Sequence, residues 1–249
     1  MTAALATEDL HKSFGALAVT RGVTLALPQG RRHAIIGPNG AGKTTLFNLL
    51  AGTVRPDRGR ILLAGADVTG TTPDARARRG LARSFQRNNL FPEMTVEAAL
   101  MTAVAIADGR SAVFWRRFDR DGDLASRAAA LAGEVGLADL LASEIGHLAY
   151  GAQRQVEVAL ALAGKPRVLL LDEPTAGMSP EETGAMQSLL TRLPSALTIL
   201  VIEHDMDVVL GLAERVTVLD HGAILMEGSP EEVRASDEVR RRYLGERTR

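Results

Sequence analysis

The sequence has no cysteine and no long apolar run, and each shortage excludes a class of protein. Without cysteine, a disulfide framework and thiolate sites for zinc or iron–sulfur clusters are excluded, and a reducing compartment such as the cytoplasm is expected. The longest segment without a charged residue is 44–54, well short of the roughly 20 apolar residues that span a bilayer. The first ten residues lack a basic segment followed by an apolar one, so we expect no secretory signal.

Positive charge is not in excess either. The 29 Lys and Arg residues are offset by 30 Asp and Glu, so the net charge of −1 favours neither nucleic acid nor an anionic membrane as a partner. Arg-rich stretches occur at 76–87 and 240–249, but acidic residues offset the second, and aromatic residues are sparse at 4%. We interpret both stretches as solvated helix faces and expect no nucleic-acid partner.

What the chain does contain is a series of short apolar runs that alternate with longer helical patterns, which is typical of an α/β fold. Several runs are continuously apolar, as in a largely parallel sheet that is covered on both faces. The strands are expected at 23–27, 33–36, 60–63, 168–171, 198–202 and 216–219.

Between residues 88 and 162 the pattern becomes helical, with helices expected at 95–107, 124–135 and 153–162 and no good strand candidate. We interpret this part as a helical lobe. Within it, the polar segment 108–123 holds the only tryptophan, Trp115, and is expected to be a surface connection. Trp115 either packs locally beneath Arg116 and Arg117 or meets a membrane or a partner.

A phosphate-binding motif lies between the expected strand 33–36 and a helix candidate. The segment 37–44 reads GPNGAGKT and fits G-x-x-x-x-G-K-[ST]. Its glycines allow backbone N–H groups to curl around a phosphate, while Lys43 reaches the β- and γ-phosphates and Thr44 binds Mg²⁺. The chain has only three lysines, so a chance match is rare; the alternative is a plain glycine turn before a helix.

Two carboxylates end the apolar run 168–171. Parallel strands place their carboxyl ends, and therefore ligands, at one edge of the sheet, so Asp172 and Glu173 are expected near the phosphate loop. Asp172 is predicted to hold Mg²⁺, and Glu173 to accept a proton from the water that attacks the γ-phosphate. His204 follows the apolar strand 198–202 and could donate a hydrogen bond to a γ-phosphate oxygen.

With these motifs in this order, the chain resembles the ATP-binding subunits of ABC transporters over nearly its whole length. The resemblance implies a P-loop NTPase core with a mainly parallel sheet, an N-terminal antiparallel β part and an inserted helical lobe. It divides a single domain, 1–249, into a nucleotide-binding core at 1–87 and 163–249 and a helical lobe with the signature motif at 88–162.

Further motifs carry the resemblance. Gln86 would lie in the Q-loop and touch Mg²⁺ and the attacking water, and residues 148–154 (LAYGAQR) look like the signature that closes over the ATP of the other subunit. Residues 175–178 align with the D-loop, and His204 with the switch histidine. Phe14 would stack on adenine; its alternative is a core position. The implied nucleotide contacts are Gly37, Pro38, Asn39, Gly40, Ala41, Gly42, Lys43, Thr44 and Thr45, with Ala149, Gly151 and Gln153 from the second subunit.

Two positions depart from the general family pattern. Ala149 replaces the usual signature serine, and Ala152 replaces the usual Gln or Glu after the signature glycine. Alanine at the first position is similar to one ATPase subunit of branched-chain amino acid importers, as are residues 176–180 (AGMSP) and 202–206 (IEHDM). Ala152 is the less expected of the two.

The resemblance therefore implies an ATPase with ATP and Mg²⁺ as cofactors, located peripherally at the cytoplasmic face of the inner membrane. Its partners would be membrane permease subunits, a second copy or a paralogue in a dimer, and an extracytoplasmic substrate-binding protein for branched-chain or other hydrophobic amino acids. Alternatives are the ATPase of a urea, amide or lipopolysaccharide transporter, a non-transport ABC ATPase and a non-hydrolysing regulator. One compact copy argues against the non-transport ATPase, and Glu173 against the regulator.

Overall fold

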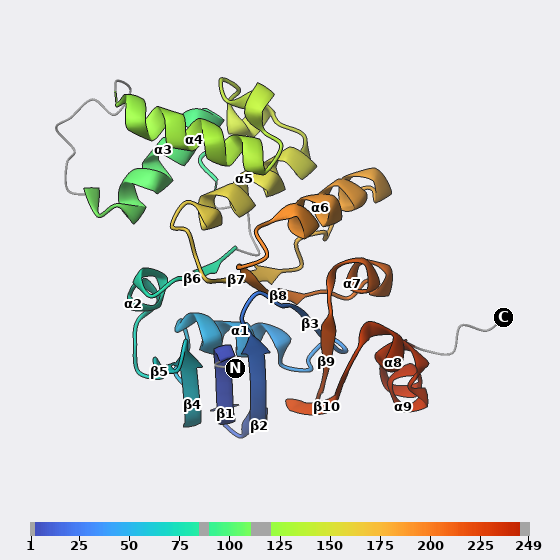
Figure 1. Cartoon of the computed structure of the whole chain (residues 1–249). Helices are drawn as coiled ribbons and strands as arrows, with labels where there is room; N and C mark the ends of the chain where they lie inside the picture. Colours follow the sequence, from blue (N-terminus) through green and yellow to red (C-terminus); the bar gives the residue numbers. More distant parts are fainter. Residues whose placement is uncertain (1–2, 85–89, 111–120, 245–249) are drawn as a thin grey trace.

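Two sheets form the lower part of the molecule in the computed structural model, which describes residues 3–84, 90–110 and 121–244 (Figure 1). The first sheet is antiparallel, with strand order β2-β1-β4-β5. Its strands are β1 (Ala3–Phe14), β2 (Leu17–Pro28), β4 (Arg58–Leu63) and β5 (Ala66–Asp67). Alternating burial along β1 and β2 is typical of strands with one face on a core and one toward solvent.

The second sheet has the order β10-β9-β3-β8-β7-β6. Its strands are β3 (Arg32–Ile36), β6 (Leu81–Arg83), β7 (Val168–Asp172), β8 (Thr198–Ile202), β9 (Arg215–Asp220) and β10 (Ala223–Gly228). The strands β6, β7, β8, β3 and β9 run parallel, while β10 is antiparallel to β9. Every residue of β7 and β8 is buried, which explains why these strands read as continuous apolar runs.

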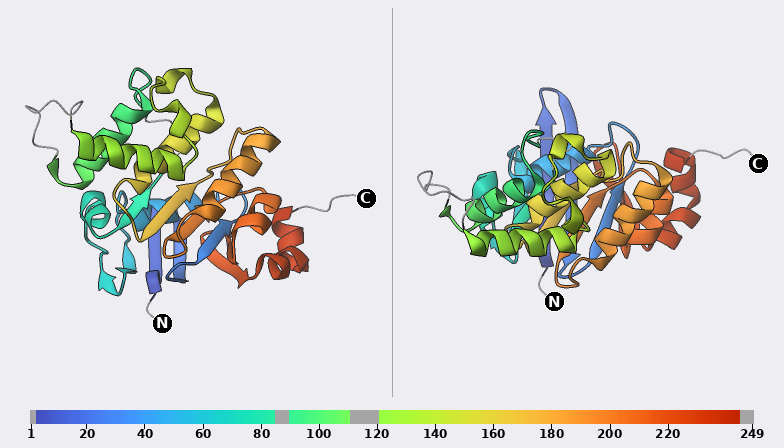
Figure 2. Two further views of the ribbon diagram at one scale, coloured as in Figure 1. Left: turned by 45° about the horizontal axis from the view of Figure 1, so that its top comes forward. Right: turned by 90° about the horizontal axis from the view of Figure 1, so that it is seen from above.

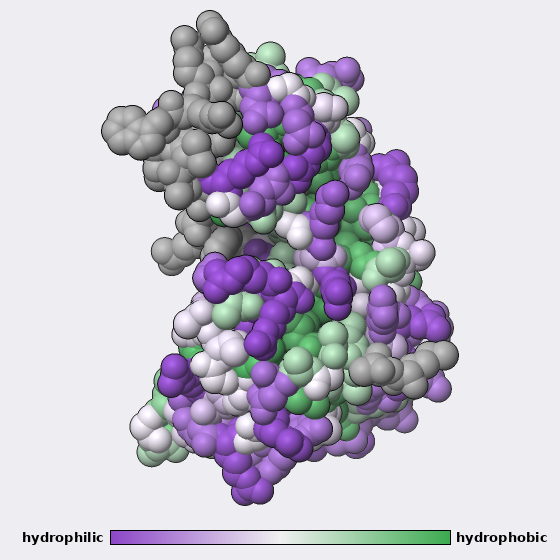
Figure 3. Space-filling view, turned by 60° about the vertical axis from the view of Figure 1, so that its left-hand side comes forward, coloured by the Kyte–Doolittle hydropathy of each residue, from purple (hydrophilic) through white to green (hydrophobic). Residues whose placement is uncertain are grey.

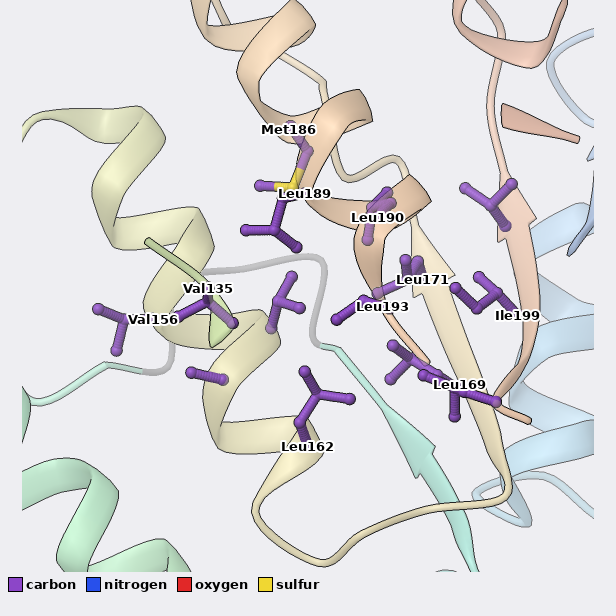
Figure 4. Close-up of a cluster of buried hydrophobic side chains, with 14 of the residues drawn as sticks. Val135, Val156, Leu162, Leu169, Leu171, Met186, Leu189, Leu190, Leu193 and Ile199 are labelled. Atoms are coloured by element: carbon purple, nitrogen blue, oxygen red, sulfur yellow. The ribbon is translucent and has the colours of Figure 1, made fainter. Parts of the chain in front are cut away.

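The parallel sheet separates two hydrophobic cores. On one face, Ile35, Leu170 and Leu200 pack with α1 and with the antiparallel sheet. The neighbouring residues, such as Leu169, Leu171 and Ile199, belong to the other core, with α3 to α6. Figure 4 shows this second core, where residues of β7 face Met186, Leu189 and Leu190 of α6 and Leu162 of α5. Successive side chains of a strand point to opposite faces of the sheet, so each strand contributes residues to both cores.

Most helices begin after a residue whose side chain accepts a hydrogen bond from one of the first N–H groups. Thr72, Thr95, Asp121, Ser179, Asp205 and Ser229 each cap a helix through the side chain. The helices are α1 (Lys43–Ala51), α2 (Pro73–Arg78), α3 (Val96–Ala107), α4 (Gly122–Glu134), α5 (Tyr150–Leu162), α6 (Pro180–Arg192), α7 (Met206–Leu212), α8 (Pro230–Ala235) and α9 (Asp237–Val239). Figure 2 shows α3, α4 and α5 grouped on one side of the parallel sheet, away from the antiparallel one.

The predicted fold class, an antiparallel part joined to a mainly parallel sheet, is confirmed. All six predicted strands exist; those at 23–27 and 60–63 lie in the antiparallel sheet and the other four in the parallel one. The three predicted helices are α3, α4 and α5. Helix α5 begins at Tyr150, three residues earlier than expected, so Gly151 lies inside its first turn. Trp115 lies outside the described residues.

In the described part of the chain, no helix is both long and apolar enough to cross a bilayer. Figure 3 shows one face of the molecule, on which polar residues cover much of both layers and apolar residues are visible between them.

Candidate nucleotide-binding site

The loop between β3 and α1 has a shape that only glycine allows at two positions. Gly37 and Gly42 adopt φ angles of 150° and 99°. A Cβ atom would lie 2.1 Å from the carbonyl oxygen of Leu219 at position 37, and 2.5 Å from that of Val19 at position 42. Gly40 also has a positive φ, 81°, but has open space around it. Close backbone approach therefore requires glycine at positions 37 and 42, and the role of this loop as a phosphate cradle stays a prediction.

Lys43 lies on this loop with its side chain nearly buried. Its Nζ donates hydrogen bonds to the carbonyl oxygens of Gly37 at 2.7 Å and Pro38 at 3.0 Å. Burial lowers the pKa of Lys43, while the negative charges of Glu173 and Asp172 oppose that shift. The first turn of α1 contains no acidic residue and no side-chain cap. Its N–H groups and the Lys43 ammonium can therefore both bind an anion.

Asp172 ends β7 at the same edge of the sheet. Its side chain is nearly fully buried, and its Oδ2 accepts a hydrogen bond from Arg83 at 3.0 Å. Burial raises the pKa of Asp172, and the charge of Arg83 opposes that rise. Arg83 also donates to Asn48 Oδ1 at 2.6 Å, and so joins β6 and α1 to the end of β7.

The other oxygen of Asp172, Oδ1, is buried without a hydrogen-bond partner. A buried acceptor left in this state is costly unless a cation or water satisfies it, so Asp172 fits a role as Mg²⁺ ligand. Thr44 is exposed in the first turn of α1, next to Lys43. Among the described residues no cluster of three or more His, Asp or Glu could hold a metal, so Mg²⁺ would depend on a few protein oxygens and on the phosphates.

Glu173 follows Asp172 in a turn with unusual backbone geometry. Its φ is 50°, a left-handed conformation that residues other than glycine adopt rarely. The backbone N–H of Glu173 donates to the carbonyl of Ile202 at 3.0 Å, and its carbonyl accepts from Ala176 at 3.1 Å. These bonds hold the strained residue in place, which is typical of functional sites.

Glu203 was not among the predicted site residues, although it lies next to His204. Its carboxylate is fully buried and accepts hydrogen bonds from the N–H and the hydroxyl of Thr175, at 3.2 and 2.7 Å. Burial raises the pKa of Glu203, and the bonds from Thr175 oppose that rise. His204 itself is exposed at the end of β8. A carboxylate directly after the apolar residues 199–202 was the signal for Glu203.

The predicted signature residues surround the start of α5. Ala149 is exposed and precedes the helix without a side-chain cap, and Gln153 Nε2 donates to the carbonyl of Leu148 at 3.0 Å. The N–H of Gly151, expected to be offered to an anion, already donates to Glu182 Oε1 at 3.0 Å. Residues of α5 belong to the helical core and those of α1 to the opposite core, so the signature and the phosphate loop lie in different layers.

Phe14 and Gln86 are the predicted site residues outside the phosphate loop, the ends of β7 and β8 and the signature. Phe14 is 51% exposed at the end of β1, with Lys12 Nζ 5.5 Å from its ring centroid, so the core alternative for this residue is wrong. Its stacking on adenine remains a prediction. Gln86 lies outside the described residues; Arg83, three positions earlier, was not predicted, and its place at the end of β6 could have suggested a role.

This arrangement of a glycine loop, a lysine and two strand-end carboxylates defines the class of the protein as a P-loop nucleotide-binding ATPase. The family described as ABC transporter matches residues 20–176, more than half of the chain. The chain belongs to the ABC transporter family and is an ATPase subunit that binds ATP and couples its hydrolysis to transport.

Three relatives illustrate the similarity. The chain is 38% identical to the high-affinity branched-chain amino acid transport ATP-binding protein BraF of Pseudomonas aeruginosa, over 97% of this chain and 98% of that one. It is 35% identical to the lipopolysaccharide export system ATP-binding protein LptB of Acidithiobacillus ferridurans, over 99% and 98% of the two chains. The crystal structure of MJ1267, an ATP-binding cassette in its ADP conformation, superposes with a TM-score of 0.88 at 29% identity, covering 99% of this chain and 100% of that one.

Proposed function

We propose that this ATPase subunit drives the import of branched-chain or other hydrophobic amino acids. The observation that carries the proposal is the 38% identity with the branched-chain amino acid relative over almost the full length of both chains. The subunit would act at the cytoplasmic face of the inner membrane with permease subunits, while a substrate-binding protein outside delivers the amino acid. The helical segment 88–162 would be the lobe that carries the signature.

The residues around the phosphate loop have distinct roles in this proposal. Lys43 and the N–H groups of α1 hold the phosphates, and Thr44, Asp172 and Gln86 hold Mg²⁺, which neutralises charge on the phosphate oxygens. The unpartnered Oδ1 of Asp172 supports its share of this role. Phe14, exposed beside Lys12, stacks on the adenine.

Hydrolysis depends on residues at the ends of β7 and β8. Glu173 accepts the proton of the attacking water, and its turn is held against β8 by the bond to Ile202. His204, exposed at the end of β8, donates a hydrogen bond to the γ-phosphate. The oppositely placed layers of α1 and α5 support a dimer in which Ala149, Gly151 and Gln153 reach the ATP of the second subunit.

Amino-acid uptake by intact cells tests the proposal. Cells that lack the gene should lose uptake of radiolabelled leucine, the gene should restore it, and the Glu173→Gln variant should not. Excess valine should compete with leucine in the restored cells. Normal leucine uptake in the deletion strain, together with loss of urea uptake or of lipopolysaccharide at the cell surface, would contradict the amino-acid proposal and favour one of the alternatives.

A further inference from the structure

Glu182 joins two segments that the sequence motifs treat as separate. It is the third residue of α6, where its Oε2 accepts from the N–H of Ser179 at 2.9 Å and its own N–H donates to Ser179 Oγ at 3.2 Å. Its second oxygen, Oε1, accepts from the N–H of Gly151 in the first turn of α5. One carboxylate therefore caps the N-termini of two helices.

The contact with Gly151 is close enough to explain the glycine. A Cβ atom at position 151 would lie 2.9 Å from Glu182 Oε1 and 3.1 Å from its Cγ. Position 151 has no positive φ, so conformational freedom does not require glycine there. The close contact with Glu182 favours glycine, because a Cβ atom at this position would force the Glu182 side chain to shift away from the N–H group.

A second link runs parallel to the first. The hydroxyl of Tyr150 donates to the carbonyl of Ala176 at 3.2 Å, and Arg154 Nε donates to the same hydroxyl at 3.0 Å. Residues 148–151 are thus tied to residues 176–182 at two points. The first turn of α5 is thus hydrogen-bonded both to the turn after Glu173 and to the first turn of α6.

The Gly151 N–H is also the donor that the proposed dimer directs toward a phosphate of the other subunit. It already has an anionic acceptor within its own chain, and the bonds from Ser179 and Gly151 lower the pKa of Glu182, which favours the charged carboxylate. A phosphate that binds at the start of α5 must displace the Glu182 carboxylate from this N–H group. The phosphate and the carboxylate are both negatively charged and repel each other at this short distance.

We propose that Glu182 is a latch on the signature turn: its carboxylate occupies the Gly151 N–H in the isolated subunit and must release it when a second, ATP-loaded subunit closes on this surface. The latch rests on the proposed ATP-dependent dimer and sets the ATP concentration at which that dimer forms. Because Ala149 has no hydroxyl, this turn can offer only main-chain N–H donors to a phosphate. The Gly151 N–H is one of these few donors, so its occupation by Glu182 has a larger effect.

Sedimentation velocity across an ATP titration tests the latch, in the Glu173→Gln background so that hydrolysis does not deplete the dimer. Glu182→Gln keeps the α6 cap, since glutamine also serves in a capping box, but removes the charge. The ATP concentration for half-maximal dimer should fall about three- to tenfold, because a neutral acceptor binds the N–H roughly half as strongly. Glu181→Gln removes the same charge from the exposed neighbouring position and should leave the midpoint unchanged.

The outcomes separate the latch from the function on which it rests. An unchanged or higher midpoint for Glu182→Gln, with a normal dimer in the Glu173→Gln parent, overturns the latch alone and makes Glu182 a fixed support of the signature turn. If Glu181→Gln lowers the ATP midpoint by the same factor, the effect comes from the loss of one negative charge near the surface and not from the bond to Gly151, which also overturns the latch. Absence of any ATP-dependent dimer in the parent overturns both the latch and the proposed dimer.

Discussion

The buried carboxylate of Glu203 binds Thr175 twice, through the N–H at 3.2 Å and through the hydroxyl at 2.7 Å. Glu203 directly follows β8 and precedes His204, and Thr175 lies two residues after Glu173. The same carboxylate accepts from the N–H of His204 at 3.3 Å. Through Glu203, the turn that carries the proposed base and the residue proposed to contact the γ-phosphate are held as one unit.

This pair should be strongly coupled in stability. Glu203→Ala and Thr175→Val should each lower the free energy of unfolding, and the double variant should lose about 1–3 kcal/mol less than the sum, because hydrogen bonds to a buried charged group are shared between the two. Urea denaturation of the four proteins measures the coupling. Thr102→Val, on the exposed face of α3, is the matched control and should show no coupling with Glu203→Ala. Strict additivity for Thr175→Val would contradict the account.

Lys43→Ala should weaken ATP binding by at least tenfold, because it removes the positive charge that faces the phosphates. The same change leaves the Gly37 and Pro38 carbonyls without their donor, so a small loss of thermal stability is also expected. Equilibrium titration with a fluorescent ATP analogue gives the affinity. Lys165→Ala, at an exposed lysine, should bind as the wild type does. Equal affinities for all three proteins would remove the phosphate-loop assignment.

His33 makes stability depend on pH. It is buried on β3 with Nε2 2.7 Å from Thr217 Oγ1, and burial lowers its pKa to about 4, with Arg215 adding to the shift and Glu227 opposing it. In the unfolded chain this histidine has an ordinary pKa near 6.5, so between about pH 6.5 and 4 it is protonated in the unfolded chain but neutral in the folded one. The free energy of unfolding should therefore fall as the pH drops from about 6.5 to 4, by about 3 kcal/mol at most from this residue.

Urea denaturation at pH 7, 6 and 5 measures this dependence. His33→Gln should have a lower stability at pH 7 and a smaller fall toward pH 5 than the wild type. His147→Gln, at a side chain that is 81% exposed, should keep the wild-type slope. A slope for His33→Gln identical to that of the wild type would show that His33 titrates normally in the folded protein.

Ala149→Ser should tighten the ATP-bound dimer in the Glu173→Gln background, because the added hydroxyl can donate to a phosphate of the opposing subunit. The gain is at most about 1.5–3 kcal/mol. A serine at this cap position can also stabilise α5 by itself, by about 0.5–2 kcal/mol. Unfolding without ATP measures that second effect separately. A dimer that is no tighter, or weaker, would mean that residue 149 does not reach the opposing phosphate.

Local sequence patterns predicted the central strands and the loop, but not the residues that tie them together. β7 and β8 were predictable because both faces are buried and four of the five residues in each strand are apolar. β1 contains charged residues among its apolar ones, because one face is exposed, and its 12 residues gave no such run. Lys43 and Asp172 could be predicted because the residues next to them in the sequence, a glycine-rich loop and an apolar strand, indicate their roles.

The missed residues depend on partners far along the chain. Arg83 meets Asp172 across 89 residues, Glu203 meets Thr175 across 28, and Glu182 meets Gly151 across 31. Each of these side chains is an ordinary charged residue in its own segment, and its partner becomes apparent only when the sheet and helices pack. The expectation that Gly151 offers its N–H to an external anion overlooked an acceptor within the chain for the same reason.

Glu173 is the proposed base for ATP hydrolysis, and the Glu173→Gln variant tests this role directly. The amide keeps the shape of the side chain but cannot accept the proton, so ATP affinity should stay within about twofold while single-turnover hydrolysis falls by about 10²–10⁴. Glu134→Gln, at an exposed end of α4, is the control and should hydrolyse ATP normally. Hydrolysis by Glu173→Gln at the wild-type rate, with ATP bound equally well, would contradict the account.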